Sequence, residues 1–178
     1  MVIPANPSWY GLERPIAFTL ILGSAISLAT TGVISPLLIL SAITYWSVVP
    51  LVHIFALWIV WKKSGRAVAF PRAIDTFFAG FTPWTVWLIG FGGLWALPFA
   101  LTSVWLNGFR LVWLYGGSAA AAAMSLYSDY RFFRFAWQLG SSDARRLLIV
   151  HRCITWPILL LIIGAPTIWS ETTGRIWL

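Results

Sequence analysis

The stretch IAFTLILGSAISLATTGVISPLLILSAITYWSVVPLVHIFALWIVW, Ile16–Trp61, contains no charged residue and decides the fold class. A helix that crosses a membrane needs about 20 apolar residues, so this run is long enough for two such helices. The sequence predicts the first helix over 16–33 and the second over 37–61, with a break near Gly32. Pro36 marks the start of the second helix, because proline is well tolerated in a first helical turn.

Three further apolar segments follow the same pattern. They predict spans over 74–97, 111–127 and 147–168. We therefore expect an all-α, polytopic transmembrane helical bundle of about five spans, forming a single integral membrane domain over 1–178. A four-span arrangement, in which one apolar run is re-entrant, remains the alternative.

The composition excludes several classes of protein. The chain is 60% hydrophobic and only 10% charged, whereas an ordinary soluble domain is about a quarter charged. The net charge of +7 does not indicate a nucleic-acid partner, because the basic residues flank apolar runs, as topology determinants do. With Cys153 as its single cysteine and no catalytic or phosphate-binding motif, the chain is expected to have no metal site and no catalytic activity of its own.

The distribution of basic residues predicts the orientation. Arg14, the loop Lys62–Arg72 and the loop Arg131–Arg146 fall on one side of a five-span model, which the positive-inside rule makes cytoplasmic. The N-terminus is then cytoplasmic, and a bacterial cytoplasmic (inner) membrane is the expected location. Arg110 falls on the opposite side, where we expect it to extend to the outer headgroups or to pair with Glu171.

The fourth span carries a run of small residues, in which Gly116, Gly117 and Ala120 are the predicted helix-packing positions. Small side chains let helix backbones approach closely in lipid, so we expect this face to be the tightest interface in the bundle. The segment 130–139 is predicted to be a separate interfacial helix whose aromatic side chains enter the headgroup layer. Ser141 or Ser142 is expected to cap the fifth span.

Two histidines are candidate cofactor ligands. His53 lies within the second span and His151 near the start of the fifth, at similar predicted depths. Ionisable residues inside a membrane are costly and therefore often functional. Two neutral imidazoles on different helices are suited to binding a b-type haem from opposite faces. The alternative is that each histidine makes an ordinary structural contact.

Asp75 and Arg152 are candidate lipid- or quinone-binding residues. We expect them to face a cavity near the inner leaflet, between spans two, three and five. For Asp75 the alternative is a role at a helix N-terminus, where the backbone dipole favours a carboxylate. For Arg152 the expected partner is a lipid phosphate of the inner leaflet.

These features favour a non-catalytic polytopic membrane subunit that packs against other membrane proteins or cofactors in a larger complex, with membrane lipids as further partners. The tryptophan-rich surface supports this interpretation, because indole side chains favour the boundary between water and lipid. Two alternatives stay open: a membrane anchor that binds b-type haem or a quinone for electron transfer, and a lipid-handling or trafficking-type membrane protein.

Two segments carry a resemblance to a known family. One is Lys62–Trp84, which includes FPRAIDTFFAGFTPW, and the other is Asp129–Arg152. In their order along the chain these segments resemble the Yip-domain (Ypt-interacting) family of small membrane proteins. The resemblance implies a cytoplasmic N-terminus, five closely packed spans and two basic cytoplasmic loops, and it implies no catalytic residues.

Overall fold

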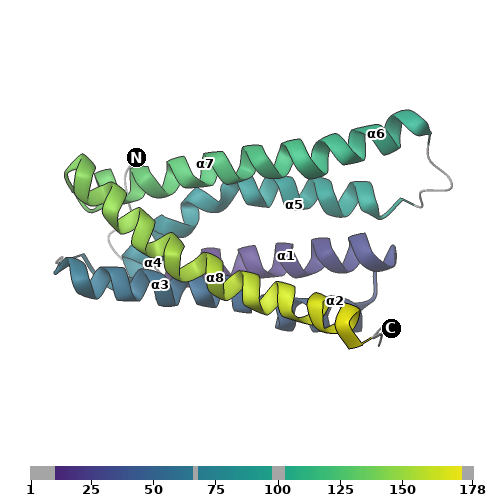
Figure 1. Ribbon diagram of the computed structural model, residues 1–178, viewed down its shortest axis with the longest axis horizontal. Helices are drawn as coiled ribbons and strands as arrows, with labels where there is room; N and C mark the ends of the chain where they lie inside the picture. The colour runs from purple at the N-terminus through teal and green to yellow at the C-terminus, as the bar shows by residue number, and fades with distance from the viewer. Residues whose placement is uncertain (1–10, 66–67, 98–102, 174–178) are drawn as a thin grey trace.

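In the computed structural model, the described residues are 11–65, 68–97 and 103–173, with side chains described up to residue 162. They form five helical rods and contain no strand, which confirms the predicted all-α class. Figure 1 shows the rods lying side by side along one long axis. The first rod is α1 (Glu13–Thr31), and the second consists of α2 (Pro36–Trp46) and α3 (Val48–Ser64). The third consists of α4 (Phe70–Phe78), the 3-10 turn η2 (Ala79–Phe81) and α5 (Thr82–Trp95). The fourth consists of α6 (Val104–Val112), the π-helical segment η4 (Trp113–Gly117), α7 (Ser118–Arg131) and the π-helical segment η5 (Phe132–Ala136), and the fifth is α8 (Ser141–Thr173).

Three of these rods are long and apolar enough to cross a membrane: Glu13–Thr31, Pro36–Ser64 and Phe70–Trp95. Their outward faces are apolar as well. Leu37 of α2 and Ile89 of α5, for example, are 72% and 61% exposed. Side chains of this kind are stable on an outer surface when lipid rather than water surrounds it. The chain is therefore a membrane protein.

The turn between the first two rods lies where the sequence predicts it. α1 ends at Thr31, and Gly32 follows with a φ of 65°, a left-handed conformation that glycine adopts without steric cost. The Gly32 N–H donates to the Leu28 carbonyl at 2.9 Å and so closes the helix end. Pro36 then opens α2, where its missing N–H is not needed.

Two prolines interrupt rods that the sequence presents as continuous spans. Pro50 has no N–H to donate to the Trp46 carbonyl, and α2 and α3 are accordingly separated at Ser47. Pro83 likewise leaves the Ala79 carbonyl without its usual donor. The Thr82 hydroxyl donates to that carbonyl instead, at 3.1 Å, so η2 replaces a full helical turn there.

The core lies at the end of the bundle that holds the α3–α4 and α7–α8 turns (Figure 1). It consists mainly of aromatic rings from α4, η2 and η5. The predicted separate helix over 130–139 is wrong, because α7 continues through η5 without a break. Phe133 and Trp137 are 0% and 2% exposed and pack into the core, while Phe135 is 66% exposed and faces outward.

A reciprocal tryptophan contact joins α5 to η4. The Trp87 indole N–H donates to the Trp113 carbonyl at 3.0 Å, and the Trp113 indole N–H donates to the Trp87 carbonyl at 3.1 Å. Each indole lies over a glycine of the opposite rod. A Cβ on Gly90 would lie 2.4 Å from Trp113 Cζ2, and a Cβ on Gly117 would lie 2.9 Å from Trp87 Cδ1. The two glycines therefore make room for the two hydrogen-bonded indoles.

The other predicted packing residues of this segment lie elsewhere. Gly116 and Ala120 are exposed on the outside of the rod, while Gly117 faces α5. The physical reason is the π-helical geometry of η4, which widens the turn and changes which residues face inward. Gly92 makes a close contact of its own, since a Cβ there would lie 3.0 Å from the Ala25 Cα of α1.

We expect Gly90→Ala to destabilise the protein by about 1–3 kcal/mol, the usual cost of overpacking a well-filled interior. The added methyl group would overlap the Trp113 indole, which must move and lose its hydrogen bond to Trp87. Unfolding in mixed micelles, followed by circular dichroism, measures the change. Gly93→Ala is the matched control, because a Cβ there meets nothing within 4 Å. Equal stability of the two variants would contradict the prediction.

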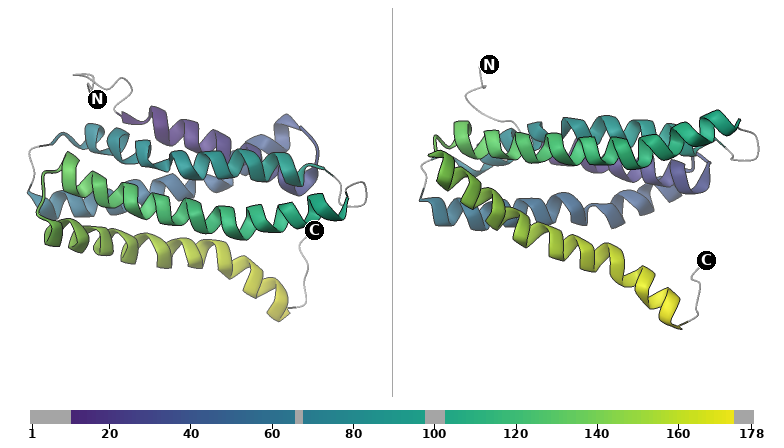
Figure 2. Two further views of the ribbon diagram at one scale, coloured as in Figure 1. Left: turned by 90° about the horizontal axis from the view of Figure 1, so that it is seen from above. Right: turned by 45° about the horizontal axis from the view of Figure 1, so that its top comes forward.

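The last rod is set apart from α6 and α7 over half its length. α8 packs mainly against α3, and its C-terminal half diverges from α6 and α7 (Figures 1 and 2). The Tyr45 hydroxyl of α2 reaches the Ile162 carbonyl of α8 at 3.5 Å. The rod therefore leans toward α2 and α3, away from α7.

Candidate functional site: a buried polar cluster beside a lateral groove

An ion pair inside the bundle links α7 to α8. Asp129 Oδ2 accepts a hydrogen bond from Arg152 Nη2, and the Asp129 and Arg152 side chains are 0% and 14% exposed. The same Nη2 donates to Ser125 Oγ at 3.2 Å. Ser125 and Asp129 share one face of α7 because they are four residues apart. Two helices are thus joined by a buried charge pair, and such a pair is costly to break because one charge is left without its partner.

Two histidines lie next to this pair. The rings of His53 and His151 have centroids 5.4 Å apart and an interplanar angle of 30°. Both are enclosed by phenylalanine rings, with Phe81 5.0 Å from His53 and Phe77 4.9 Å from His151. His53 is 4% exposed and His151 is 0% exposed. The sequence places the histidines at similar depth, and the structure brings them into direct contact.

The two histidines do not fit a haem. Phe77 packs against both rings, with its centroid 6.1 Å from that of His53 and 4.9 Å from that of His151. A macrocycle between the imidazoles would have to displace this phenylalanine and separate two rings that already touch. We therefore assign no haem-binding role to His53 and His151.

Asp75 and Arg152 do not share a site. Asp75 lies in the second turn of α4 and pairs with Arg14 of α1, whose Nη1 is 3.3 Å from Asp75 Oδ2. Arg14 Nη1 also donates to the Asp75 carbonyl at 2.9 Å. This pair joins α1 to α4, whereas Arg152 joins α7 to α8. The predicted site between spans two, three and five is therefore replaced by two separate ion pairs.

A groove opens beside the buried ion pair, between α5, α7 and α8. Its volume is about 430 Å³. Arg152 and Ser125 are its polar members, and the Arg152 guanidinium carbon lies 5.9 Å from the centre of the Trp156 ring. The remaining lining residues are apolar: Trp84, Ala122, Leu126, Trp156, Leu159 and Leu160. The groove therefore combines one polar end with an extended apolar wall.

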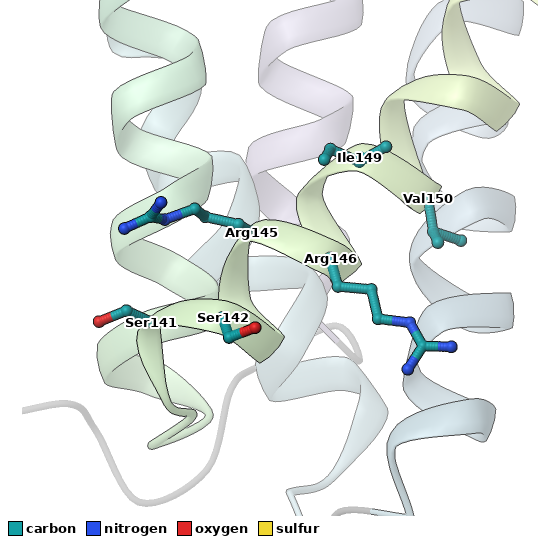
Figure 3. Close-up of a pocket in the computed structure, with 6 residues that line it drawn as sticks. All are labelled: Ser141, Ser142, Arg145, Arg146, Ile149 and Val150. Atoms are coloured by element: carbon teal, nitrogen blue, oxygen red, sulfur yellow. The ribbon is translucent and has the colours of Figure 1, made fainter.

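A second hollow, of about 580 Å³, lies at the start of α8 (Figure 3). Its lining residues are Ser141, Ser142, Arg145, Arg146, Ile149 and Val150. Figure 3 shows Arg145 and Arg146 pointing to opposite sides of the helix, so the two cations do not converge on one ligand. The predicted cap by Ser141 or Ser142 is wrong. The helix begins at Ser141, and the carbonyl that precedes it, that of Gly140, accepts from the Ala144 N–H at 2.9 Å.

Arg110 has a structural role that the sequence did not predict. Its side chain is 0% exposed and binds the C-terminal end of α5, where Nε donates to the Leu94 carbonyl at 2.8 Å and Nη2 donates to the Leu97 carbonyl. Nη1 donates to Asn107 Oδ1 at 2.9 Å. A cation is favoured there by the helix dipole. The expected extension to the outer headgroups is therefore wrong, and the side chain of Glu171 lies outside the described residues.

Asp129 is the site residue that sequence reasoning missed, because the basic residues around it suggested an exposed loop. The available signal was the spacing of Ser125 and Asp129 by four residues, which places a hydroxyl and a carboxylate on one helical face. A similar spacing relates His151 to Thr155, which is also 0% exposed. Among the described residues, no group of three or more His, Cys, Asp or Glu side chains is placed to hold a metal ion.

A scan against protein-family models, a search of the curated proteins and a search of the solved structures each find no match to this chain. The resemblance to the Yip-domain family consequently stays a prediction.

Proposed function

We propose that this chain is a five-span integral membrane protein with a cytoplasmic N-terminus, and that it serves as a non-catalytic subunit of a larger complex. Its role is to pack against a transmembrane helix of another membrane protein. The proposed location of the protein is a bacterial cytoplasmic membrane. The proposed role rests on the small-residue surface of α7.

The distribution of charge supports the orientation. The N-terminal end of α1, the α3–α4 turn and the α7–α8 turn all lie at one end of the bundle (Figure 1). Lysines and arginines concentrate at this end: Arg14, Lys62, Lys63, Arg72, Arg131, Arg134, Arg145 and Arg146. By the positive-inside rule this end faces the cytoplasm. α8 has 33 residues and a length of about 50 Å, enough to serve as the fifth span.

One observation carries the functional proposal. Gly116, Ala119, Ala120 and Ala123 are all exposed, at positions that follow the spacing of one helical face. Helices associate in lipid mainly through close packing of small residues, since lipid supplies no hydrophobic drive. A small-residue stripe that is left outside the bundle is therefore suited to a helix of another chain.

A neighbouring groove extends this surface. It lies between α5 and α7, has a volume of about 500 Å³, and includes Ala120 and Met124 together with Val86 of α5. Met124 and Val86 are 57% and 56% exposed. Flexible and branched apolar side chains beside a small-residue stripe form a shallow apolar channel. A transmembrane helix with its own small residues fits such a channel, because its backbone can approach the α7 backbone closely.

We expect Ala120→Leu to weaken complex formation at least tenfold, because the larger side chain holds the partner helix away from α7. The wild-type chain should co-purify with another membrane protein in a mild detergent, at a fixed ratio that size-exclusion chromatography and mass spectrometry measure. Ala17→Leu, the same change at an exposed position of α1, is the control and should leave the ratio unchanged. A uniform wild-type monomer without a co-purifying membrane protein would overturn the proposal.

A further inference from the structure

We propose that the groove between α5, α7 and α8 is a binding site for a lipoquinone, a neutral molecule with a planar, carbonyl-bearing ring and an apolar tail. The ring would lie at the Arg152 end, and the tail would follow α8 toward Leu160. This activity is independent of the helix-docking role proposed above, because the groove and the exposed small-residue stripe lie on different faces of α7.

Charge balance at the polar end favours a neutral ligand. Arg152 is already compensated by Asp129, and the two share a direct hydrogen bond. An anionic headgroup would compete for the guanidinium and leave a fully buried carboxylate without its partner. Arg152 lines the groove, and both hydrogen bonds that its guanidinium makes to the described residues are donated by Nη2, to Asp129 and to Ser125. A guanidinium has several donors, so Nη1 can donate to a ligand carbonyl while the ion pair stays intact.

The walls of the groove favour a planar ring. Trp84 of α5 and Trp156 of α8 both line it, and the Arg152 guanidinium lies near the face of Trp156. Aromatic side chains bind planar rings by stacked or edge-on contact. Ser125, whose hydroxyl is bound by Arg152, completes the polar end. A carbonyl-bearing ring thus finds aromatic surface and hydrogen-bond donors in one place.

The size and the opening of the groove suit a tailed molecule that enters from the bilayer. A volume of about 430 Å³ is within the usual range of about 300–1,000 Å³ for small-molecule sites. The lining residues of α8 run from Arg152 to Leu160, a distance of about 12 Å along the helix. Leu160 is 71% exposed and Trp156 is 50% exposed, so the far end of the groove meets the lipid.

Binding of decylubiquinone to the purified chain in nanodiscs tests the proposal. Quinones quench tryptophan fluorescence on contact, and two tryptophans line the groove. We expect saturable quenching in the wild-type protein. Ala122→Phe fills the groove without touching the ion pair and should weaken binding at least tenfold. Ala17→Phe, an equal change at an exposed position of α1, is the control and should bind like the wild type.

A second variant tests the polar end. Arg152→Lys keeps the positive charge but loses the planar donor geometry, so we expect at least tenfold weaker binding in a protein that stays folded. Quenching that rises linearly with quinone concentration and is equal in all variants would show partition into the bilayer and would overturn the proposal. Saturable quenching by phosphatidylglycerol with brominated chains, in place of the quinone, that disappears in Ala122→Phe would show that the groove binds a phospholipid. That result would also overturn the lipoquinone assignment. Neither outcome depends on whether a partner helix binds α7.

Discussion

Replacing Arg152 with methionine will lower the free energy of unfolding by about 3–5 kcal/mol, the usual cost of removing one partner of a buried ion pair. Asp129 is 0% exposed and has no hydrogen bond at Oδ1 within the described residues, so the protein offers its charge no second cation. The loss comes from the carboxylate left behind more than from the missing arginine. Unfolding of the purified protein in mixed micelles measures it.

Two further variants separate this mechanism from a simple loss of packing. The double variant Asp129→Asn with Arg152→Met removes both charges and should recover most of the stability, because no uncompensated charge remains. Arg145→Met removes an exposed arginine of the same helix and should change stability by no more than about 0.5 kcal/mol. If the double variant is as unstable as Arg152→Met, the buried charge is not the cause.

The second large effect is expected at Arg110. Arg110→Met removes the donors to the Leu94 and Leu97 carbonyls at the end of α5. A hydrogen bond donated by a charged group contributes about 1.5–3 kcal/mol. Leu94 is half-buried and Leu97 is 48% exposed, so we expect a loss of about 1.5–3 kcal/mol, mainly from the Leu94 carbonyl. Backbone amide hydrogen exchange should become faster in the last turn of α5, where the helix loses its cap. Exchange in the rest of the protein should be unaffected.

Arg131→Met provides the comparison for Arg110. Arg131 is exposed and lies 5.9 Å from the Tyr127 ring centre, a contact of small energetic value at the surface. The free energy of unfolding of Arg110→Lys should lie between those of Arg110→Met and Arg131→Met, because a single ammonium group cannot donate to both carbonyls as the guanidinium does. Equal stability of Arg110→Met and Arg131→Met would show that the α5 cap contributes little.

The helices themselves follow from local signals in the sequence. The charge-free run Ile16–Trp61 is too long for one span, and Gly32 and Pro36 mark the turn by their own backbone chemistry. Such signals act within a few residues and do not depend on the rest of the fold. The interruptions at Pro50 and Pro83 also have a local cause, the missing N–H of proline. They were not predicted, because the spans were placed by their apolar character, which a missing N–H does not change.

The site depends on contacts that no local signal specifies. The pairing of Asp129 with Arg152 requires α7 to continue past the end of its apolar segment. It also requires α8 to pass α7 at the level where Arg152 can reach Asp129. His53 and His151 come together only because α3 and α8 pack against each other. The sequence therefore marked Arg152, His53 and His151 as unusual, but it did not predict the pairing of Arg152 with Asp129 or the contact between the two histidines.

The inward positions of the fourth rod recur every four residues: Gly117, Ala121, Ser125, Asp129, Phe133 and Trp137. An α-helix has 3.6 residues per turn, so such a row drifts around the rod, while the wide turns of η4 and η5 reduce the drift at both ends. Loss of a single residue from η4 would rotate everything beyond it by about 100° relative to α5. Homologous chains should accordingly vary in loop length far more readily than in the number of residues between Trp113 and Asp129.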